Sequence, residues 1–250
     1  MSTMKIILRK KYNEFHEDSS LISKVISENN FTYINILEIL RKTVSSKSIS
    51  TVLDIGCGVG AIDFYLARKG YKVTGIDISN KAIKVAKQSA KELNILTVNF
   101  LSSSVEDLKL KDRFDLIICS EVLEHLQDDM KALLKMNILL KDNGGIIVSV
   151  PSVNAPLYKL GLAEKFDKRV GHLRRYSLNQ IVSLIEKAGF KIEETYKTEG
   201  VIRNSLYLFK QLGFFIRLIK GPLVKIASSI DRMTIPLFGE SQIFVVARKI

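Results

Sequence analysis

The feature that most constrains the fold is a regular alternation of short apolar runs and amphipathic segments. The apolar runs, expected to be strands, are residues 51–55, 71–77, 95–101, 114–120 and 144–150. Helical periodicity marks residues 61–70, 79–93, 128–140 and 177–190, and two later strands are expected at 191–196 and 242–250. Strands that alternate with helices form mainly parallel sheets through right-handed crossovers. We therefore expect an α/β fold of the Rossmann-like, doubly wound type, with helices on both faces.

Two further segments flank this pattern. Residues 19–47 carry helical periodicity and predict an N-terminal helical cap within residues 1–47. Residues 200–240 are apolar with interspersed basic residues, and they fall between the last two expected strands. Gly221 and Pro222 should divide this second segment. We expect one domain over residues 1–250, with 200–240 as an apolar helical insertion.

Composition bounds the compartment and the partners. Cys57 and Cys119 are the only two cysteines and have no metal-like spacing, which favours a reducing compartment over a disulfide scaffold. The chain has neither a run apolar enough for a spanning helix nor an N-terminal run long enough for a signal peptide, so we expect a cytoplasmic protein. A net charge of +12 suits polyanions such as nucleic acid or an anionic membrane, although many lysines fit solvated helix faces.

A glycine-rich turn follows the first expected strand. Gly56, Gly58 and Gly60 open the next helix, so backbone can approach a ligand closely there. The spacing also satisfies a dinucleotide fingerprint whose last position is Ala61. Asp54 argues against that alternative, because its carboxylate would repel a pyrophosphate but would accept hydrogen bonds from an α-amino group. Asp77, which ends the second strand, suits ribose hydroxyls in either case.

The motifs "VLDIGCGVG", "VTGIDIS", "SSSVEDL" and "FDLIICSEVLEHL", in this order, resemble those of the class I S-adenosylmethionine-dependent methyltransferases. The resemblance covers roughly residues 30–198 and the last strand. It implies a seven-stranded sheet of order 3-2-1-4-5-7-6 and S-adenosylmethionine as cofactor. Within that family the chain is most similar to the ubiquinone-biosynthesis O-methyltransferase-like group.

The resemblance also implies roles for particular residues. Asp54 would help to hold the methionine amino group, and Asp77 would bind the ribose. Ser104 stands where many relatives have aspartate. The complete set of residues expected at the cofactor is Asp54, Gly56, Cys57, Gly58, Asp77, Ile78, Ser104, Val105, Glu106 and Ser120.

The stretch "SEVLEH", residues 120–125, follows the fourth strand directly. On a helix its spacing would stack Glu121, Glu124 and His125 on one face. In some members of the related group such a segment is associated with a divalent metal, so these three residues are candidate ligands, although the same letters also occur in relatives that need no metal. Zn²⁺ or Mn²⁺ would accept the histidine more readily than Mg²⁺. A general-base role for Glu121 or His125, or a purely structural role for Glu124, are the alternatives.

A third candidate group is "GHLRRYS", residues 171–177, which lies where the family's acceptor loops often occur. His172 joins Glu121 and His125 as a residue expected near the acceptor. Arg174, Arg175 and Tyr176 could hold an anionic head group by charge-assisted hydrogen bonds. The alternative is a surface loop whose Ser177 caps the next helix.

The expected reaction is methyl transfer to an oxygen of an amphiphilic small molecule, such as a quinone precursor, lipid or glycolipid. RNA or protein as acceptor, and a catalytically silent cofactor-binding partner subunit, are the alternatives. Motifs of base-methylating enzymes are absent after the fourth strand, which argues against nucleic acid. Residues 200–228 combine apolar and basic side chains, which predicts peripheral contact with the inner face of a membrane. A helix pair packed on the sheet or at a dimer interface would explain the same pattern.

Overall fold

The structure is a computed structural model and describes residues 9–13, 25–27, 29–45 and 48–250. The remaining parts of the predicted N-terminal cap lie outside the described residues. Among the described residues, the helix expected over 19–47 is limited to α2 (Ile34–Ser45). Residues 9–13 form a separate short helix. Asn30 is the physical reason, because its side-chain oxygen accepts from Thr32 N and holds residues 30–33 in a turn.

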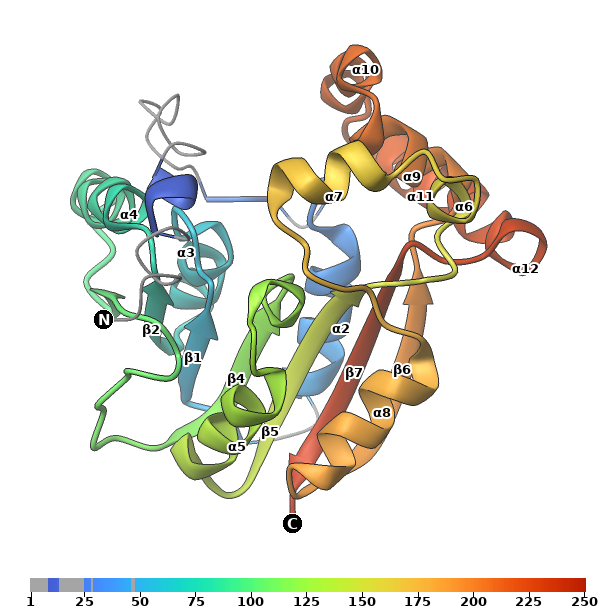
Figure 1. Ribbon diagram of the computed structural model, residues 1–250. Coiled ribbons are helices and arrows are strands. Elements are labelled where there is room, and N and C mark those ends of the chain that lie inside the picture. Colours follow the sequence, from blue (N-terminus) through green and yellow to red (C-terminus); the bar gives the residue numbers. More distant parts are fainter. Residues whose placement is uncertain (1–8, 14–24, 28, 46–47) are drawn as a thin grey trace.

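A seven-stranded sheet forms the centre of the molecule (Figure 1). Its strands are β1 (Thr51–Ile55), β2 (Lys72–Asp77), β3 (Val98–Ser102), β4 (Phe114–Ser120), β5 (Leu140–Pro151), β6 (Phe190–Thr198) and β7 (Gln242–Lys249). They lie in the order β3-β2-β1-β4-β5-β7-β6, so the predicted order is confirmed. Only β7 runs antiparallel to its neighbours, β5 and β6. The carboxyl ends of the other six strands and the start of β7 therefore meet at one edge.

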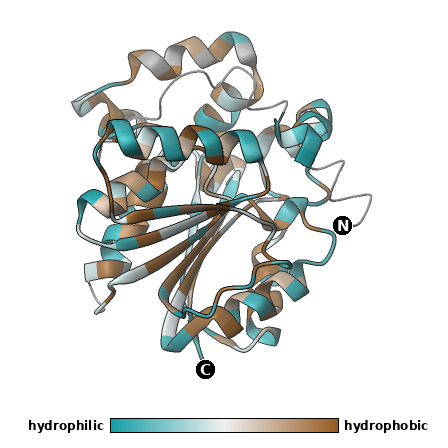
Figure 2. Cartoon of the chain, turned by 90° about the vertical axis from the view of Figure 1, so that its left-hand side faces the viewer, coloured by the Kyte–Doolittle hydropathy of each residue, from teal (hydrophilic) through white to brown (hydrophobic). Residues whose placement is uncertain are grey.

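Helices cover both faces of the sheet, as expected for a doubly wound fold. On one face lie α5 (Asp129–Leu139) and α8 (Leu178–Lys187); on the other lie α2, α3 (Ala61–Arg68) and α4 (Asn80–Glu92). Neighbouring residues of β5 enter opposite cores, since Ile146 packs with the α5 and α8 side and Ile147 with the α2 and α3 side. Figure 2 shows the resulting apolar strands between helices that carry hydrophilic residues.

The fifth strand is longer than its apolar run predicts. The structure begins β5 at Leu140, four residues before the expected start, and α5 ends at Leu139. Leu140 is fully buried and pairs with Phe114 of β4 across a register shift. The register with β4 then passes from Leu140 to Gly145, and Asn143 between them has a φ angle of 62°, so the turn tendency of Asn143 and Gly144 persists as an irregularity within the strand.

Short helices cover the carboxyl edge of the sheet. After β5 come α6 (Pro156–Lys159) and α7 (Glu164–Val170), and between β6 and β7 come α9 (Val201–Leu208), η2 (Lys210–Leu212), α10 (Gly213–Leu218), α11 (Pro222–Met233) and α12 (Ile235–Phe238). The chain breaks at Gly221 and Pro222 as expected, with α11 beginning at the proline. None of the helices in the described residues is long and apolar enough to cross a bilayer.

Candidate functional site

The glycine turn after β1 adopts left-handed backbone conformations. The φ angles of Gly56, Gly58 and Gly60 are 78°, 55° and 85°. A Cβ at Gly56 would lie 2.3 Å from a methyl carbon of Val122, whereas one at Gly58 would meet nothing within 4 Å. Gly56 thus permits close packing with the turn after β4, and Gly58 presents open backbone to a cavity.

Asp77 fastens this turn to the end of β2. Its Oδ2 accepts from Gly58 N at 3.0 Å and its Oδ1 accepts from Ser79 N at 2.7 Å. Ser79 in turn caps α4 by accepting from Ala82 N. The carboxylate therefore lies at the mouth of the glycine turn, where a ribose-binding acid is expected.

A first cavity of about 350 Å³ lies beside the turn and is here called the cofactor cavity. Seven residues expected at the cofactor line it: Gly56, Gly58, Asp77, Ile78, Ser104, Val105 and Glu106. Three expected residues do not line it. Asp54 is buried in β1, and the half-buried Cys57 directs its thiol at the Gly58 carbonyl. Ser120 lines a second cavity. Burial raises the pKa of the Cys57 thiol well above its usual range, so the sulfur is protonated and unreactive.

The short helix at residues 9–13 also contributes to the cofactor cavity. Tyr12 lines the cavity and packs edge-on against His125, with ring centroids 5.5 Å apart. Asn13 Oδ1 accepts from the Ser79 hydroxyl at 2.9 Å, and Lys11 Nζ donates to the Lys168 carbonyl at the end of α7. Part of the predicted N-terminal cap therefore covers the site, although periodicity over 19–47 did not identify these residues.

Asp54 has a buried partner that the sequence did not indicate. Asp63, in the first turn of α3, is fully buried next to Asp54. Burial raises the pKa of Asp54 well above its usual range and the pKa of Asp63 to about 7. The neighbouring Asp63 raises the pKa of Asp54 further, whereas hydrogen bonding to Asp54 partly lowers the pKa of Asp63. The spacing of nine residues across a strand, a turn and a helix start is no recognisable motif.

The segment "SEVLEH" does not form the expected helical face. Glu121 has a φ angle of 56° and a three-residue 3₁₀ turn, η1 (Leu123–His125), follows it. The Glu121 carboxylate turns away from Glu124 and accepts at Oε1 from Ser149 Oγ at 3.1 Å and Gln242 Nε2 at 3.0 Å. These partners on β5 and β7 select a conformation that the spacing could not reveal.

The structure brings together two members of the predicted metal-binding set, Glu124 and His125, and adds His172 to them. Ligand atoms of Glu124, His125 and His172 lie within 4.8 Å of one another, and Glu121 is not in that group. Nε2 of His125 and Nε2 of His172 are 3.7 and 3.8 Å from Glu124 Oε1. Glu124 is fully buried, and neither carboxylate oxygen has a hydrogen-bond partner among the described residues.

A hydrogen bond at Nδ1 orients each of the two imidazole rings. His125 Nδ1 is 3.0 Å from the Gly171 carbonyl, which can only accept, so this nitrogen carries the proton. His172 Nδ1 is 3.0 Å from Asp167 Oδ1, so the same tautomer is favoured there. Burial lowers the pKa of His125 to about 4, which keeps the ring neutral. The Nε2 atoms of both rings and the Glu124 side chain therefore converge, which is a set of donor atoms that a divalent metal can use.

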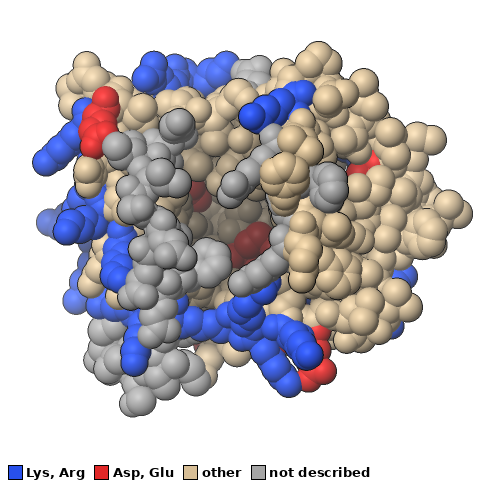
Figure 3. All heavy atoms as spheres, turned by 90° about the horizontal axis from the view of Figure 1, so that it is seen from above, with Lys and Arg blue, Asp and Glu red and all other residues tan. Residues whose placement is uncertain are grey.

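A second cavity of about 600 Å³, the acceptor cavity, adjoins the first at the carboxyl edge of the sheet. Among its polar lining residues are Tyr33, Ser120, Glu121, Arg169, His172, Arg175, Glu199, Asn204, Tyr207 and Gln242. Glu121 and Val170 line both cavities, so the two meet at the turn after β4. Viewed onto this edge, the surface is hollowed and acidic side chains lie within the hollow (Figure 3).

The group "GHLRRYS" is only partly in this cavity. Arg174 Nη1 and the Tyr176 hydroxyl both donate to Asp129 Oδ2, at 2.8 and 2.7 Å, so neither is directed at an acceptor. Arg175 lines the cavity but is bound in a bidentate manner to Asp167. Of the basic groups here, the exposed Arg169 of α7 is better placed to meet an anionic group, and sequence analysis had missed it. Ser177 caps α8, as its alternative role predicted.

Comparison with known proteins shows sequence similarity to methyltransferases. The profile of a family described as "Methyltransferase domain" matches residues 46–196. The ubiquinone biosynthesis O-methyltransferase of Haemophilus ducreyi is 36% identical over 115 residues, which are 44% of this chain and 48% of that protein. The enzyme of the same name from Rickettsia canadensis is 35% identical over 127 residues, 51% of this chain and 53% of that protein. The chain thus matches about half the length of these curated relatives.

Solved structures share the fold at low sequence identity. The N-methyltransferase NodS from Bradyrhizobium japonicum, in complex with S-adenosyl-L-homocysteine, aligns with a TM-score of 0.60 at 16% identity and 99% coverage of both chains. Phosphoethanolamine N-methyltransferase 2 from Haemonchus contortus, in complex with S-adenosyl-L-methionine, aligns with a TM-score of 0.65 at 17% identity, over 100% of this chain and 60% of that one. With its profile match, its strand order and the cavity beside its glycine turn, the chain belongs to the methyltransferase domain family.

Proposed function

We propose that the protein transfers a methyl group from S-adenosylmethionine to an oxygen of an amphiphilic small molecule, such as a quinone precursor, lipid or glycolipid. The observation that carries this proposal is the position of Glu121, which lines both the cofactor cavity and the acceptor cavity. A methyl group carried in the first cavity would point through this junction at an acceptor in the second. The names of the partial-length relatives favour oxygen over nitrogen as the methylated atom.

The cofactor would be held as the family resemblance implies. Asp77 would bind the ribose hydroxyls, and the open backbone at Gly58 would lie against the methionine part. Ser104 is partly committed to its own turn, because its hydroxyl donates to Asp107 Oδ2 at 2.9 Å. Val105 and the backbone near it would then border the adenine. The cofactor supplies a methyl group on a good leaving group, so the chain contributes mainly alignment of the two reactants.

The surface of the helical insertion supports an amphiphilic acceptor. Exposed apolar side chains project from α10 to α12, namely Phe214, Leu218, Leu223, Ile226, Ile230, Met233, Leu237 and Phe238. Lys220 and Lys225 are exposed among them. Apolar groups that enter a lipid interface, next to cations that meet anionic head groups, are typical of peripheral membrane contact. A cytoplasmic protein touching the inner membrane face through 200–228 and the following helices is therefore part of the proposal.

A divalent metal is proposed at Glu124, His125 and His172, in place of the set that included Glu121. Zn²⁺ and Mn²⁺ suit two imidazoles and one carboxylate better than Mg²⁺ does. A cation bound there would neutralise Glu124 and stiffen the wall between the two cavities. The proposed methyl transfer does not depend on that ion.

The experiment that tests the proposal uses purified protein and cofactor labelled on the methyl group, incubated with a lysate of the source organism. Label in the organic fraction supports the amphiphilic acceptor. Label confined to RNA or protein would replace it with the alternative that the charge of +12 suggests. Cofactor binding without label in any fraction would instead identify a catalytically silent partner subunit.

A further inference from the structure

The acceptor cavity contains a second carboxylate, that of Glu199, which no motif singled out. Glu199 follows the last residue of β6 and precedes α9, so it stands at the carboxyl edge like Glu121. Its φ angle is 61°, a left-handed conformation that a residue with a side chain rarely adopts. Strained residues of this kind persist where the surrounding contacts determine the backbone.

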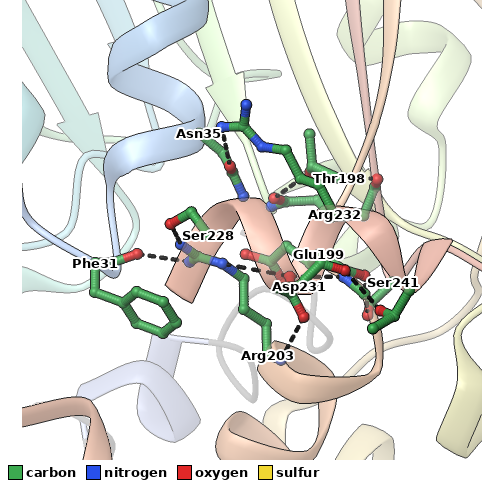
Figure 4. Close-up of polar contacts among 12 residues, drawn as sticks. Phe31, Asn35, Thr198, Glu199, Arg203, Ser228, Asp231, Arg232 and Ser241 are labelled. Carbon is green, nitrogen blue, oxygen red and sulfur yellow. Dashed lines mark hydrogen bonds and ion pairs between the residues drawn. The ribbon is translucent and has the colours of Figure 1, made fainter. Parts of the chain in front are cut away.

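Those contacts are plain in Figure 4. Ser241, just before β7, donates both its backbone N–H and its hydroxyl to the Glu199 carbonyl, each at 2.7 Å. The next backbone N–H, that of Gly200, donates to Asp231 Oδ2 at 2.8 Å. Arg203 of α9, itself buried, lies within 3.6 Å of the same carboxylate. The backbone of Glu199 is therefore held on both sides, while its side chain is directed at the cavity.

The two carboxylates of the acceptor cavity differ in their partners. Glu121 Oε1 already accepts two hydrogen bonds, from Ser149 and Gln242. Within the described residues the Glu199 carboxylate is influenced by charges but receives no hydrogen bond. Both oxygens of Glu199 are thus available to a ligand hydroxyl, whereas one oxygen of Glu121 is already bonded to Ser149 and Gln242.

The electrostatic surroundings set the protonation of Glu199. Burial, with the nearby carboxylates of Glu121 after β4 and Asp231 on α11, raises its pKa to about 7 despite the Arg203 guanidinium on α9. The other ionisable groups that line the same cavity are Tyr33 before α2, Arg169 of α7, His172 and Arg175 after α7, and Tyr207 of α9. A carboxylate that titrates near neutral pH can both accept a proton and release it to water.

We infer that Glu199 is the general base of the acceptor cavity and removes the proton from the acceptor hydroxyl during methyl transfer. The inference rests on the proposed function. In this step an oxygen lone pair forms the new O–CH₃ bond, and the electron pair of the broken S–CH₃ bond remains on sulfur. The hydroxyl proton passes to the Glu199 carboxylate, which later loses it to solvent. A neutral acceptor thereby becomes nucleophilic without hydroxide.

The test compares Glu199→Gln with the wild type, using whichever acceptor fraction takes label from the wild type. Removal of a general base should lower kcat about 10²–10⁴-fold at pH 7.5 while cofactor affinity stays unchanged. In a pH–rate profile, the wild-type rate should rise with pH through about 7, and Glu199→Gln should lack this rising limb. Glu186→Gln, an exposed glutamate of α8, is the matched control and should behave as the wild type.

A second variant, Glu199→Asp, covers the case in which Glu199→Gln does not fold. It should retain the rising limb at a reduced rate, because the carboxylate is preserved but withdrawn by one methylene. A wild-type rate in Glu199→Gln, an unchanged pH dependence in that variant, or loss of the rise with pH in Glu199→Asp would overturn the assignment of the base. Absence of label with the wild-type protein itself would overturn the proposed function instead, so the two failures are distinguishable.

Discussion

Gln242, the first residue of β7, donates a hydrogen bond from Nε2 to Oε1 of Glu121, the first residue after β4, over 3.0 Å. The contact exists because β7 is antiparallel, so that its beginning lies at the same edge as the end of β4. Ser149 of β5 reaches the same oxygen. The last strand of the chain therefore orients the side chain at the junction of the two cavities.

Gln242→Ala should loosen Glu121 without removing it. Because a small displacement of a group between aligned reactants is costly, we expect kcat to fall about tenfold. Cofactor affinity, measured by calorimetry, should change little, since Gln242 does not line the cofactor cavity. Gln88→Ala, which removes an exposed amide bonded to Glu92 on α4, is the control. A wild-type kcat in Gln242→Ala would mean that Ser149 alone positions Glu121.

Asp63→Asn should make the stability of the protein less dependent on pH. The pKa of Asp63 is raised from 3.8 to about 7 in the folded chain. The protonated side chain therefore contributes to the free energy of unfolding in full below pH 3.8, and that contribution is lost as the pH rises through about 7. Asparagine mimics the protonated acid and keeps that contribution. We expect the variant to gain about 1–3 kcal/mol in the free energy of unfolding at pH 8, relative to the wild type, and to gain little at pH 4.

The measurement is urea unfolding of both proteins at the two pH values. Asp142→Asn, at a fully exposed acid, is the control and should show no such difference. A variant that is less stable than the wild type at pH 8 would show that the ionised Asp54 and Asp63 pair is compensated by partners inside the fold.

Binding of Zn²⁺ or Mn²⁺ should depend on His172 and not on Glu121. One equivalent of metal should bind to the wild-type protein, and His172→Ala should weaken binding at least tenfold, because it removes one of three ligands. Glu121→Ala should retain the affinity, since its carboxylate is bonded to Ser149 and Gln242. Calorimetric titration of the metal-free proteins measures both. The opposite order of the two variants would restore the set that the sequence suggested.

Membrane contact should depend on the outer face of α11. Ile226 and Ile230 are 55% and 50% exposed and lie one turn apart. Replacing both with serine should reduce partition onto anionic vesicles about tenfold or more, because each side chain contributes of order 1 kcal/mol when it leaves water. Leu134→Ser with Ile138→Ser is the matched control, as these residues have the same spacing and similar exposure on α5. If both double variants lost vesicle binding equally, the binding would not be specific to the outer face of α11.

Sequence alone determined the framework of the fold and most of the cofactor cavity. Strand β1, the glycine turn, Asp77 and the capped start of α4 are local features, since each depends on residues close together in the chain. Period-two and period-3.6 patterns respond to burial on one face, which is why the seven strands and the helices between them could be predicted. Some boundaries differed, as at Leu140, where pairing with β4 lengthens the strand, and before α2, where the Asn30 turn shortens the helix.

The acceptor side was decided by tertiary structure. Glu121, Glu199 and Gln242 come from three distant parts of the chain and meet because the ends of β4 and β6 and the start of the antiparallel β7 share an edge. Asp63 reaches Asp54, and His172 reaches Glu124, through the packing of helices and loops that carry no spacing signal. A side chain's role there depends on which partners occupy its hydrogen-bonding positions, and those partners are chosen by the fold as a whole.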